Sequence, residues 1–156
     1  MEKAIQDLLA EHAFFRDMQQ HALELVAGCA KNVHFAAGSY IAHEGDDATT
    51  FYAVRRGRVA VEIYSPERGP LTVQTLGDGD ILGWSWLFAP HNWRFDAVAL
   101  ESTSAIEFDG ACLRSKVDND PVLGYEFVRR FAQVIVERLA ATSRQLADLY
   151  GRGGNP

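Results

Sequence analysis

Gly79-Asp80-Ile81-Leu82-Gly83-Trp84-Ser85-Trp86-Leu87 is the most informative stretch of this chain, and Arg94-Phe95-Asp96-Ala97-Val98 follows it after six residues. The order predicts a turn, a short strand, a glycine at the start of a helix and a lone arginine downstream. Backbone N–H groups at a helix N-terminus and a guanidinium can together hold a phosphate or a carboxylate. The stretch therefore predicts an anion site built on Gly83 and Arg94.

The side chains around these two residues are bulky or acidic. Trp84 and Trp86 flank the helix start, and Phe95 and Asp96 follow the arginine. Residues i and i+2 of a strand share a face, so Arg94 and Asp96 are placed where they can pair with each other. The backbone pattern thus predicts an anion site, whereas the side chains predict a pocket of altered size and charge.

Composition places the chain among globular domains of ordinary size. Its 156 residues are 47% hydrophobic and 23% charged, with a net charge of −6, which fits one domain with a proper core. The negative balance disfavours a dominant nucleic-acid surface. The sequence shows neither a membrane-spanning apolar run nor a signal pattern, so a cytoplasmic protein is expected. Cys29 and Cys112 are interpreted as buried free thiols rather than as a disulfide.

The periodicity of apolar residues changes twice along the chain. Residues 2–30 have helical spacing, residues 33–108 are β-rich and punctuated by glycines, and helical spacing returns after Phe108. Short strands separated by turns predict an antiparallel barrel or sandwich. The expected strands are 40–42, 50–54, 58–64, 71–76, 95–100 and 104–108.

A long helix is predicted from Pro121 to Tyr150, with Asp120 as its cap. It carries two apolar stripes. One is made of Phe127, Phe131 and Val134, and we expect it to pack on the barrel. The other alternates steps of three and four residues as a coiled-coil seam does. Its members are Tyr125, Val128, Ala132, Ile135, Leu139, Thr142, Leu146 and Leu149. The seam predicts a homodimer; the alternative is one broad core face without a dimer.

The order of helices, barrel and long helix resembles the cyclic nucleotide-binding domain superfamily. Residues 40–46 and 50–59 are similar to its first signature, and residues 79–83 with 94–98 to its phosphate-binding cassette. The resemblance implies a mainly β fold, a jelly-roll-like antiparallel β-barrel with an N-terminal helical segment and a long C-terminal helix. The expected division is 1–31 for the N-terminal helices, 32–109 for the barrel and 110–150 for the C-terminal helices.

The cassette departs from the family pattern where ligand contacts are expected. The family has a glutamate where this chain has Trp84, and a small residue where it has Trp86. A small pair follows the family's arginine, where this chain has Phe95 and Asp96. The expected ligand-binding residues are Gly83, Trp84, Ser85, Trp86, Arg94, Phe95 and Asp96.

Three regulatory functions remain open on this pattern. The first is a sensor of cAMP or cGMP, and the second is a sensor of another small organic anion. The third is a ligand-free scaffold in which the indoles fill the pocket and an Arg94–Asp96 pair closes it. A ligand would move the cassette against Phe127 and Phe131 of the long helix. Since the sequence ends at Pro156, we expect no helix-turn-helix and no direct DNA binding, but a protein partner that reads the sensor.

An enzyme is the remaining alternative. A metal-dependent, cupin-like barrel would use His34, His43, Glu44 and His91 as ligands. His43 and Glu44 are adjacent in the sequence and point to opposite faces of a strand, so no metal site is predicted. No set of catalytic residues can be assembled, and the interpretation is a non-catalytic domain.

Overall fold

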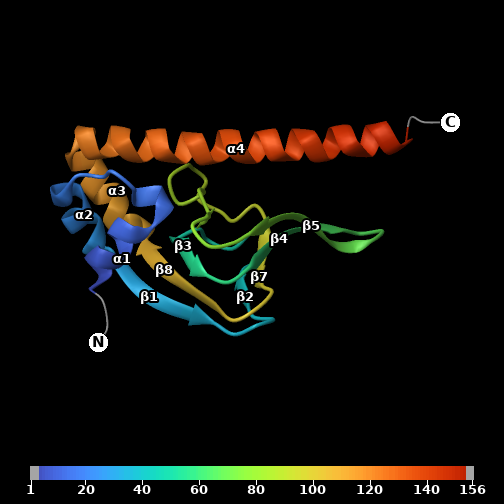
Figure 1. The fold of residues 1–156 in the computed structure, drawn as a ribbon, viewed down its shortest axis with the longest axis horizontal. Coiled ribbons are helices and arrows are strands. Elements are labelled where there is room, and N and C mark those ends of the chain that lie inside the picture. Colours follow the sequence, from blue (N-terminus) through green and yellow to red (C-terminus); the bar gives the residue numbers. More distant parts are fainter. Residues whose placement is uncertain (1–3, 154–156) are drawn as a thin grey trace.

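The computed structural model describes residues 4–153, and the side chains of residues 4–151. Figure 1 shows a β-structure with short helices packed at one end and one long helix, α4, running along the whole molecule. The strands form two four-stranded antiparallel sheets, ordered β1-β8-β3-β6 and β2-β7-β4-β5. The expected jelly-roll-like architecture with flanking helices is confirmed.

The strand boundaries agree closely with the sequence pattern. The strands are β1 Ala30–Phe35, β2 Tyr40–Ala42, β3 Thr50–Arg56, β4 Val59–Ser65, β5 Gly69–Leu76, β6 Ile81–Leu82, β7 Asp96–Ala99 and β8 Thr103–Asp109. Strand β1 was not among the expected strands. It pairs with β8 over its full length, from Ala30 opposite Phe108 to Phe35 opposite Thr103, and this partner is distant in sequence.

The helices are α1 Ile5–Glu11, η1 Ala13–Phe15 (a 3-10 turn), α2 Gln20–Ala27, α3 Gly110–Asn119 and α4 Pro121–Gly153. The expected cap of α4 is present, because the Asp120 carboxylate accepts a hydrogen bond from the Leu123 N–H at 3.1 Å. Asp109 caps α3 in the same way through the Cys112 N–H. The prediction that a helix begins at Gly83 is wrong: the segment after it forms only a turn, closed by Leu87 N–H to Trp84 O.

The buried residues form two clusters. One lies between the helices and the outer face of a sheet and is dominated by aromatic rings, among them Phe15, Phe51, Phe108, Phe127 and Phe131. The other fills the space between the two sheets and includes Val54, Val59, Leu82, Trp93 and Ala105. The cassette segment lies where these clusters meet, since Trp86 belongs to the first cluster and Trp93 to the second.

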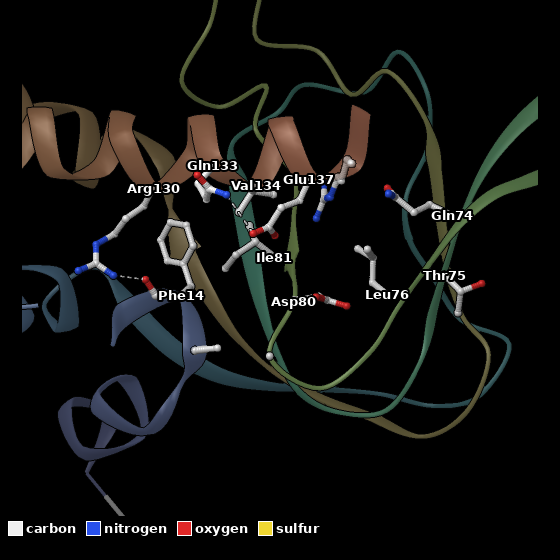
Figure 2. A pocket seen from close by; sticks show the side chains of 13 residues that line it. Phe14, Gln74, Thr75, Leu76, Asp80, Ile81, Arg130, Gln133, Val134 and Glu137 are labelled. Carbon is white, nitrogen blue, oxygen red and sulfur yellow. Dashed lines mark hydrogen bonds between the residues drawn. The ribbon is translucent and has the colours of Figure 1, made fainter. Parts of the chain in front are cut away.

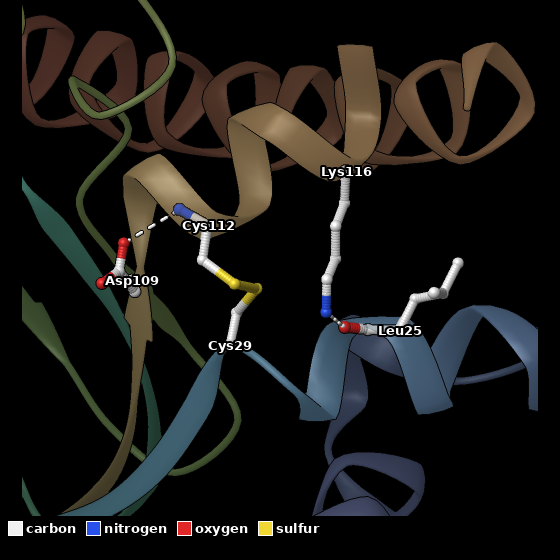
Figure 3. Close-up of a disulfide and its surroundings, with 5 residues drawn as sticks. All are labelled: Leu25, Cys29, Asp109, Cys112 and Lys116. Atoms are coloured by element: carbon white, nitrogen blue, oxygen red, sulfur yellow. Dashed lines mark hydrogen bonds between the residues drawn. A yellow bond between two sulfur atoms is a disulfide. The ribbon is translucent and has the colours of Figure 1, made fainter. Parts of the chain in front are cut away.

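The interpretation of the two cysteines as free thiols is wrong for this structure. Cys29 and Cys112 form a disulfide with a Cα–Cα distance of 5.7 Å. Figure 3 shows that it joins the start of β1 to the first turn of α3, beside the contact of Lys116 with Leu25 O. The two residues are 83 positions apart, and only the β1–β8 pairing brings them together.

The two stripes of α4 differ in burial as the sequence pattern predicts. Phe127 and Phe131 are each 1% exposed and pack on Phe14 of η1. The exposed fractions along the seam run from 37% for Ile135 to 70% for Tyr125. A continuous apolar stripe therefore lies uncovered on the outer side of α4. None of the helices within residues 4–153 has the length and apolar character needed to cross a membrane.

Candidate functional site

The backbone at Gly83 leaves no room for a side chain. Its φ is +98°, a conformation that favours glycine, and a Cβ placed there would lie 2.7 Å from Cη2 of Trp93. The Trp93 indole is 7% exposed and belongs to the core between the sheets. The ring therefore lies directly against the glycine of the cassette, where the family resemblance predicts a bound phosphate.

The other two cassette tryptophans have different environments. Trp84 contacts Phe95 edge-to-face at 5.3 Å between centroids, and the Arg138 guanidinium of α4 lies 5.3 Å from the Trp84 ring. Trp86 is wholly buried on the helical side, stacked on Phe51 at 4.9 Å. Its backbone O accepts a hydrogen bond from Arg114 of α3. The Trp86 ring is therefore part of the core beneath α4 in this structure, and its role in ligand binding stays a prediction.

Beside Gly83, the tryptophans leave a cavity of only about 10 Å³. Its walls are Val61, Gln74, Leu82, Gly83, Trp84, Ser85, Trp93, Phe95 and Arg138. Pockets that bind small molecules usually measure about 300–1,000 Å³, whereas this volume suits at most one water molecule. Gly83, Trp84, Ser85 and Phe95 line this small cavity together, and their role in ligand binding stays a prediction.

Arg94 and Asp96 are not paired, and this prediction is wrong. Arg94 precedes β7 and is exposed, and among the described residues it has no hydrogen bond or ion pair. The Asp96 Oδ1 atom instead accepts a hydrogen bond from the Glu44 N–H at 2.7 Å and lies 3.9 Å from His43 Nδ1. The carboxylate therefore fixes the turn after β2, and the Arg94 guanidinium remains available.

A larger cavity of about 440 Å³ adjoins the closed one, between α4 and the barrel. Figure 2 shows Gln133, Val134 and Glu137 of α4 facing Leu76 and Asp80 of the barrel. At one end, Arg130 Nη1 donates a hydrogen bond to Phe14 O at 2.5 Å and so ties α4 to η1.

Arg138 lines both cavities. Burial lowers the pKa of its guanidinium to about 10, partly offset by Asp80 and Glu137, so it stays charged at neutral pH. Neither Arg138 nor Trp93 was among the site residues predicted from the sequence. The position of Trp93 directly before Arg94 was the only local signal for either.

The histidines considered as metal ligands lie apart from one another. His34 contacts Ser102 Oγ at 3.0 Å, and His43 stacks on Tyr40 with centroids 4.7 Å apart. Within the described range, no three His, Cys, Asp or Glu side chains are grouped as a metal ion would require.

Comparison with known proteins agrees with this architecture. A putative cyclic nucleotide-binding protein from Geobacter metallireducens superposes with a TM-score of 0.76 at 25% identity, covering 89% of this chain and 99% of that one. A cyclic nucleotide-binding domain from Methylobacillus flagellatus gives 0.78 at 19% identity, covering 93% and 82%. The second likeness concerns the fold alone.

Curated relatives match over shorter parts of their own length. The chain is 30% identical over 116 residues to the cAMP-activated global transcriptional regulator CRP of Haemophilus influenzae, covering 74% of this chain and 50% of that protein. It is 27% identical over 78 residues to a cGMP-dependent protein kinase of Drosophila melanogaster, covering 49% of this chain and 8% of the kinase. The chain therefore spans about half of the bacterial regulator and a small part of the kinase.

Residues 32–120, more than half of the chain, match the cyclic nucleotide-binding domain family. The match contains both sheets apart from the first residues of β1, together with the cassette and α3. With the two-sheet fold, the cassette glycine and the long C-terminal helix in place, the chain belongs to the cyclic nucleotide-binding domain family as a regulatory, sensor-type domain.

Proposed function

We propose that this protein is a non-catalytic sensor that does not take cAMP or cGMP in the family's usual way. The observation that carries the proposal is the position of the Trp93 ring, 2.7 Å from where a Cβ on Gly83 would be. A phosphate over Gly83 needs that space. Trp84 also stands where the family has its ribose-binding glutamate, so a charge-assisted hydrogen bond worth about 1.5–3 kcal/mol is missing.

The ligand class that the remaining groups favour is a small organic anion. Arg94 is exposed and unpaired within the described residues, and Arg138 supplies a second guanidinium at the adjoining cavity. Guanidinium groups bind carboxylates and phosphates through paired hydrogen bonds. Asp80 and Glu137 line the same cavity, which favours a ligand that also carries hydrogen-bond donors.

Signal transmission is proposed to run through α4. Trp84 contacts Arg138 of α4, while Trp86 packs against Phe131 at 5.6 Å between centroids. A ligand that displaces the cassette must therefore change contacts with this helix on two sides. A protein partner in the cytoplasm would then read the position of α4.

A dimer through α4 completes the proposal. Tyr125, Val128, Ile135, Leu139, Leu146 and Leu149 form its exposed seam. Seam packing in a coiled coil buries such residues against their counterparts on a second helix.

Calorimetry tests the exclusion of cyclic nucleotides. cAMP and cGMP are titrated separately into wild-type protein, Arg94→Ala and Arg68→Ala, the last being an exposed arginine in the β4–β5 turn. We expect no saturable heat with any of the three proteins. Micromolar binding that is lost in Arg94→Ala but kept in Arg68→Ala would overturn the proposal, since the cassette would then read a cyclic phosphate.

A ligand-free interaction module is the second candidate, and the 10 Å³ cavity at Gly83 favours it. The two candidates differ in their response to small anions. A thermal-shift screen of carboxylates and phosphate monoesters should give a hit that depends on Arg138 if the protein is a sensor. A module without a ligand should give no such hit, while its α4 seam still supports assembly.

A further inference from the structure

A second groove contains several arginines, and Gly83 of the cassette is not among its lining residues. It measures about 890 Å³ and lies between η1, β1 and the end of β3. Its polar walls include Arg16, Arg55, Arg56, Asn32, His34 and Ser104. Gly83, Trp84 and Arg94 do not line it, and it shares only Ala13 and Gly79 with the 440 Å³ cavity, so its arginines are separate from the site described above.

An irregularity in β3 directs two consecutive arginines into this groove. Neighbouring residues of a regular strand point to opposite faces, yet Arg55 and Arg56 both line the groove. The pairing of β3 with β8 shifts register between Val54 and Arg56. Bulges of this kind re-aim side chains and are frequent beside binding sites.

His12 holds this irregularity in place. The ring lies 2.9 Å from Val54 O through Nε2, and its Nδ1 accepts a hydrogen bond from the Phe14 N–H at 3.1 Å. Nδ1 is therefore unprotonated, and Nε2 is the donor to Val54 O. The same carbonyl accepts the Gly79 N–H at 2.9 Å. Two separate segments, at His12 and at Gly79, thus hold the backbone from which Arg55 and Arg56 project.

Arginines outnumber acids in the groove. Among the described residues, the side chains of Arg16, Arg55 and Arg56 have no ion pair or hydrogen bond, whereas the chain as a whole carries −6. Two acids also line the groove, and both have other partners. Asp78 Oδ1 accepts the Gly57 N–H at 3.0 Å, and Glu11 has an interaction partner. Clustered guanidinium groups repel one another and are stabilised by a bound anion.

We propose that this groove binds a compact polyanion, of the class of oligophosphates or small polycarboxylates. Its volume lies in the range of small-molecule pockets, and guanidinium groups match such oxyanions with paired hydrogen bonds. Asn32 and Ser104 add hydrogen-bonding groups at the same wall. A concave site with walls from separate segments favours a compact ligand over an extended acidic peptide.

The test is calorimetric titration of inorganic tripolyphosphate, and in parallel citrate, at low ionic strength. The proteins are wild type, Arg55→Gln and Arg56→Gln, with Arg68→Gln on the β4–β5 turn as the control and Arg94→Gln to detect binding at the cassette. We expect saturable binding that weakens at least tenfold in each groove variant and stays within twofold in Arg68→Gln. Circular dichroism melts verify that each variant is folded.

Each other outcome contradicts the proposal. Absence of saturable binding to wild type overturns it, and so does an equal loss in Arg68→Gln, which would indicate non-specific attraction. A loss confined to Arg94→Gln would place the anion at the cassette. Tighter binding of an acidic peptide than of either small anion, lost in Arg55→Gln, would replace the small-molecule site by a peptide surface. The variants keep this proposal separate from the proposed function, because a loss in Arg55→Gln or Arg56→Gln reports on the groove and a loss in Arg94→Gln reports on the cassette.

Discussion

Single residues decide whether the cassette is open or closed. Gly83 and Arg94 are recognisable in the sequence, because a glycine at a tight turn and a lone arginine have few other roles in that pattern. The ring that covers the glycine comes from Trp93, ten residues away, and its direction depends on the packing between the sheets. The same packing leaves Arg94 exposed and binds Asp96 to the turn at Glu44.

Replacing Trp93 by alanine tests the role of this ring. The side chain is almost fully buried, so Trp93→Ala should lower the free energy of unfolding by about 3–5 kcal/mol. Urea denaturation measures this change. Trp93→Phe serves as the matched control. Its free energy of unfolding should fall by less than that of Trp93→Ala, since it keeps an aromatic ring near Gly83. A loss below about 1 kcal/mol in Trp93→Ala would mean that the indole is not the main filling of this region.

His12 should make stability depend on pH in a defined direction. Burial lowers the pKa of its imidazole below the usual 6.5, opposed by the hydrogen bond to Val54 O and by Asp80. The unfolded chain then binds more protons than the folded protein as the pH falls through about 6.5. The contribution of neutral His12 to the free energy of unfolding is therefore expected to be complete above pH 7 and to decline below about pH 6.5.

The measurement is urea denaturation between pH 5 and pH 8 for wild type, His12→Gln and His21→Gln. The decline should be smaller in His12→Gln, because that variant lacks the titrating ring. His21→Gln controls for an exposed histidine and should keep the wild-type slope. If the free energy of unfolding falls equally with decreasing pH in all three proteins, His12 does not cause the loss of stability at low pH.

At the level of elements, α3 connects the N-terminal segment to the cassette. The Cys29–Cys112 disulfide anchors its first turn to β1, and Arg114 on the same helix donates to the backbone O of Trp86. Lys116 adds a bond of 2.5 Å to Leu25 O at the end of α2. Cassette, α3 and α2 are thus held as one unit by contacts that span distant parts of the chain.

Removing the disulfide should lower stability measurably. For a loop of 83 residues, the chain-entropy estimate of its stabilisation is about 4.5 kcal/mol. Cys29→Ser should therefore unfold at lower urea concentration than wild type under oxidising conditions. With dithiothreitol present, the two midpoints should converge. Equal midpoints without reductant would mean that the bond does not form in solution, as a reducing cytoplasm would favour.

For the whole molecule, the decisive surface is the outer side of α4. Figure 1 shows this helix running beyond the short helices and along the barrel to the far end of the molecule. Its inner stripe is covered by the protein itself, whereas the seam residues remain exposed. An isolated helix with so many exposed apolar residues gains stability by packing against a second one.

Light scattering on a size-exclusion column tests the dimer. We expect wild type to show twice the chain mass of 17.3 kDa, and Leu139→Glu to shift toward the chain mass. Leu139 is 65% exposed in the single chain, so the substitution should leave the fold intact. Gln145→Glu, on the same helix but off the seam, is the control. A monomeric wild type would remove the dimer from the proposed function.

The sequence by itself determined the class of fold, most strand positions, the cap of α4 and the two stripes of α4. These features depend on local spacing, turn residues and helix capping, which act between near neighbours in the chain. The tertiary structure alone decided which ring covers Gly83, that Trp86 belongs to the helical core, that Cys29 meets Cys112 and that Arg55 and Arg56 share one groove. Each of these depends on pairing between distant segments or on a shift of strand register, and neither leaves a periodic signal in the sequence.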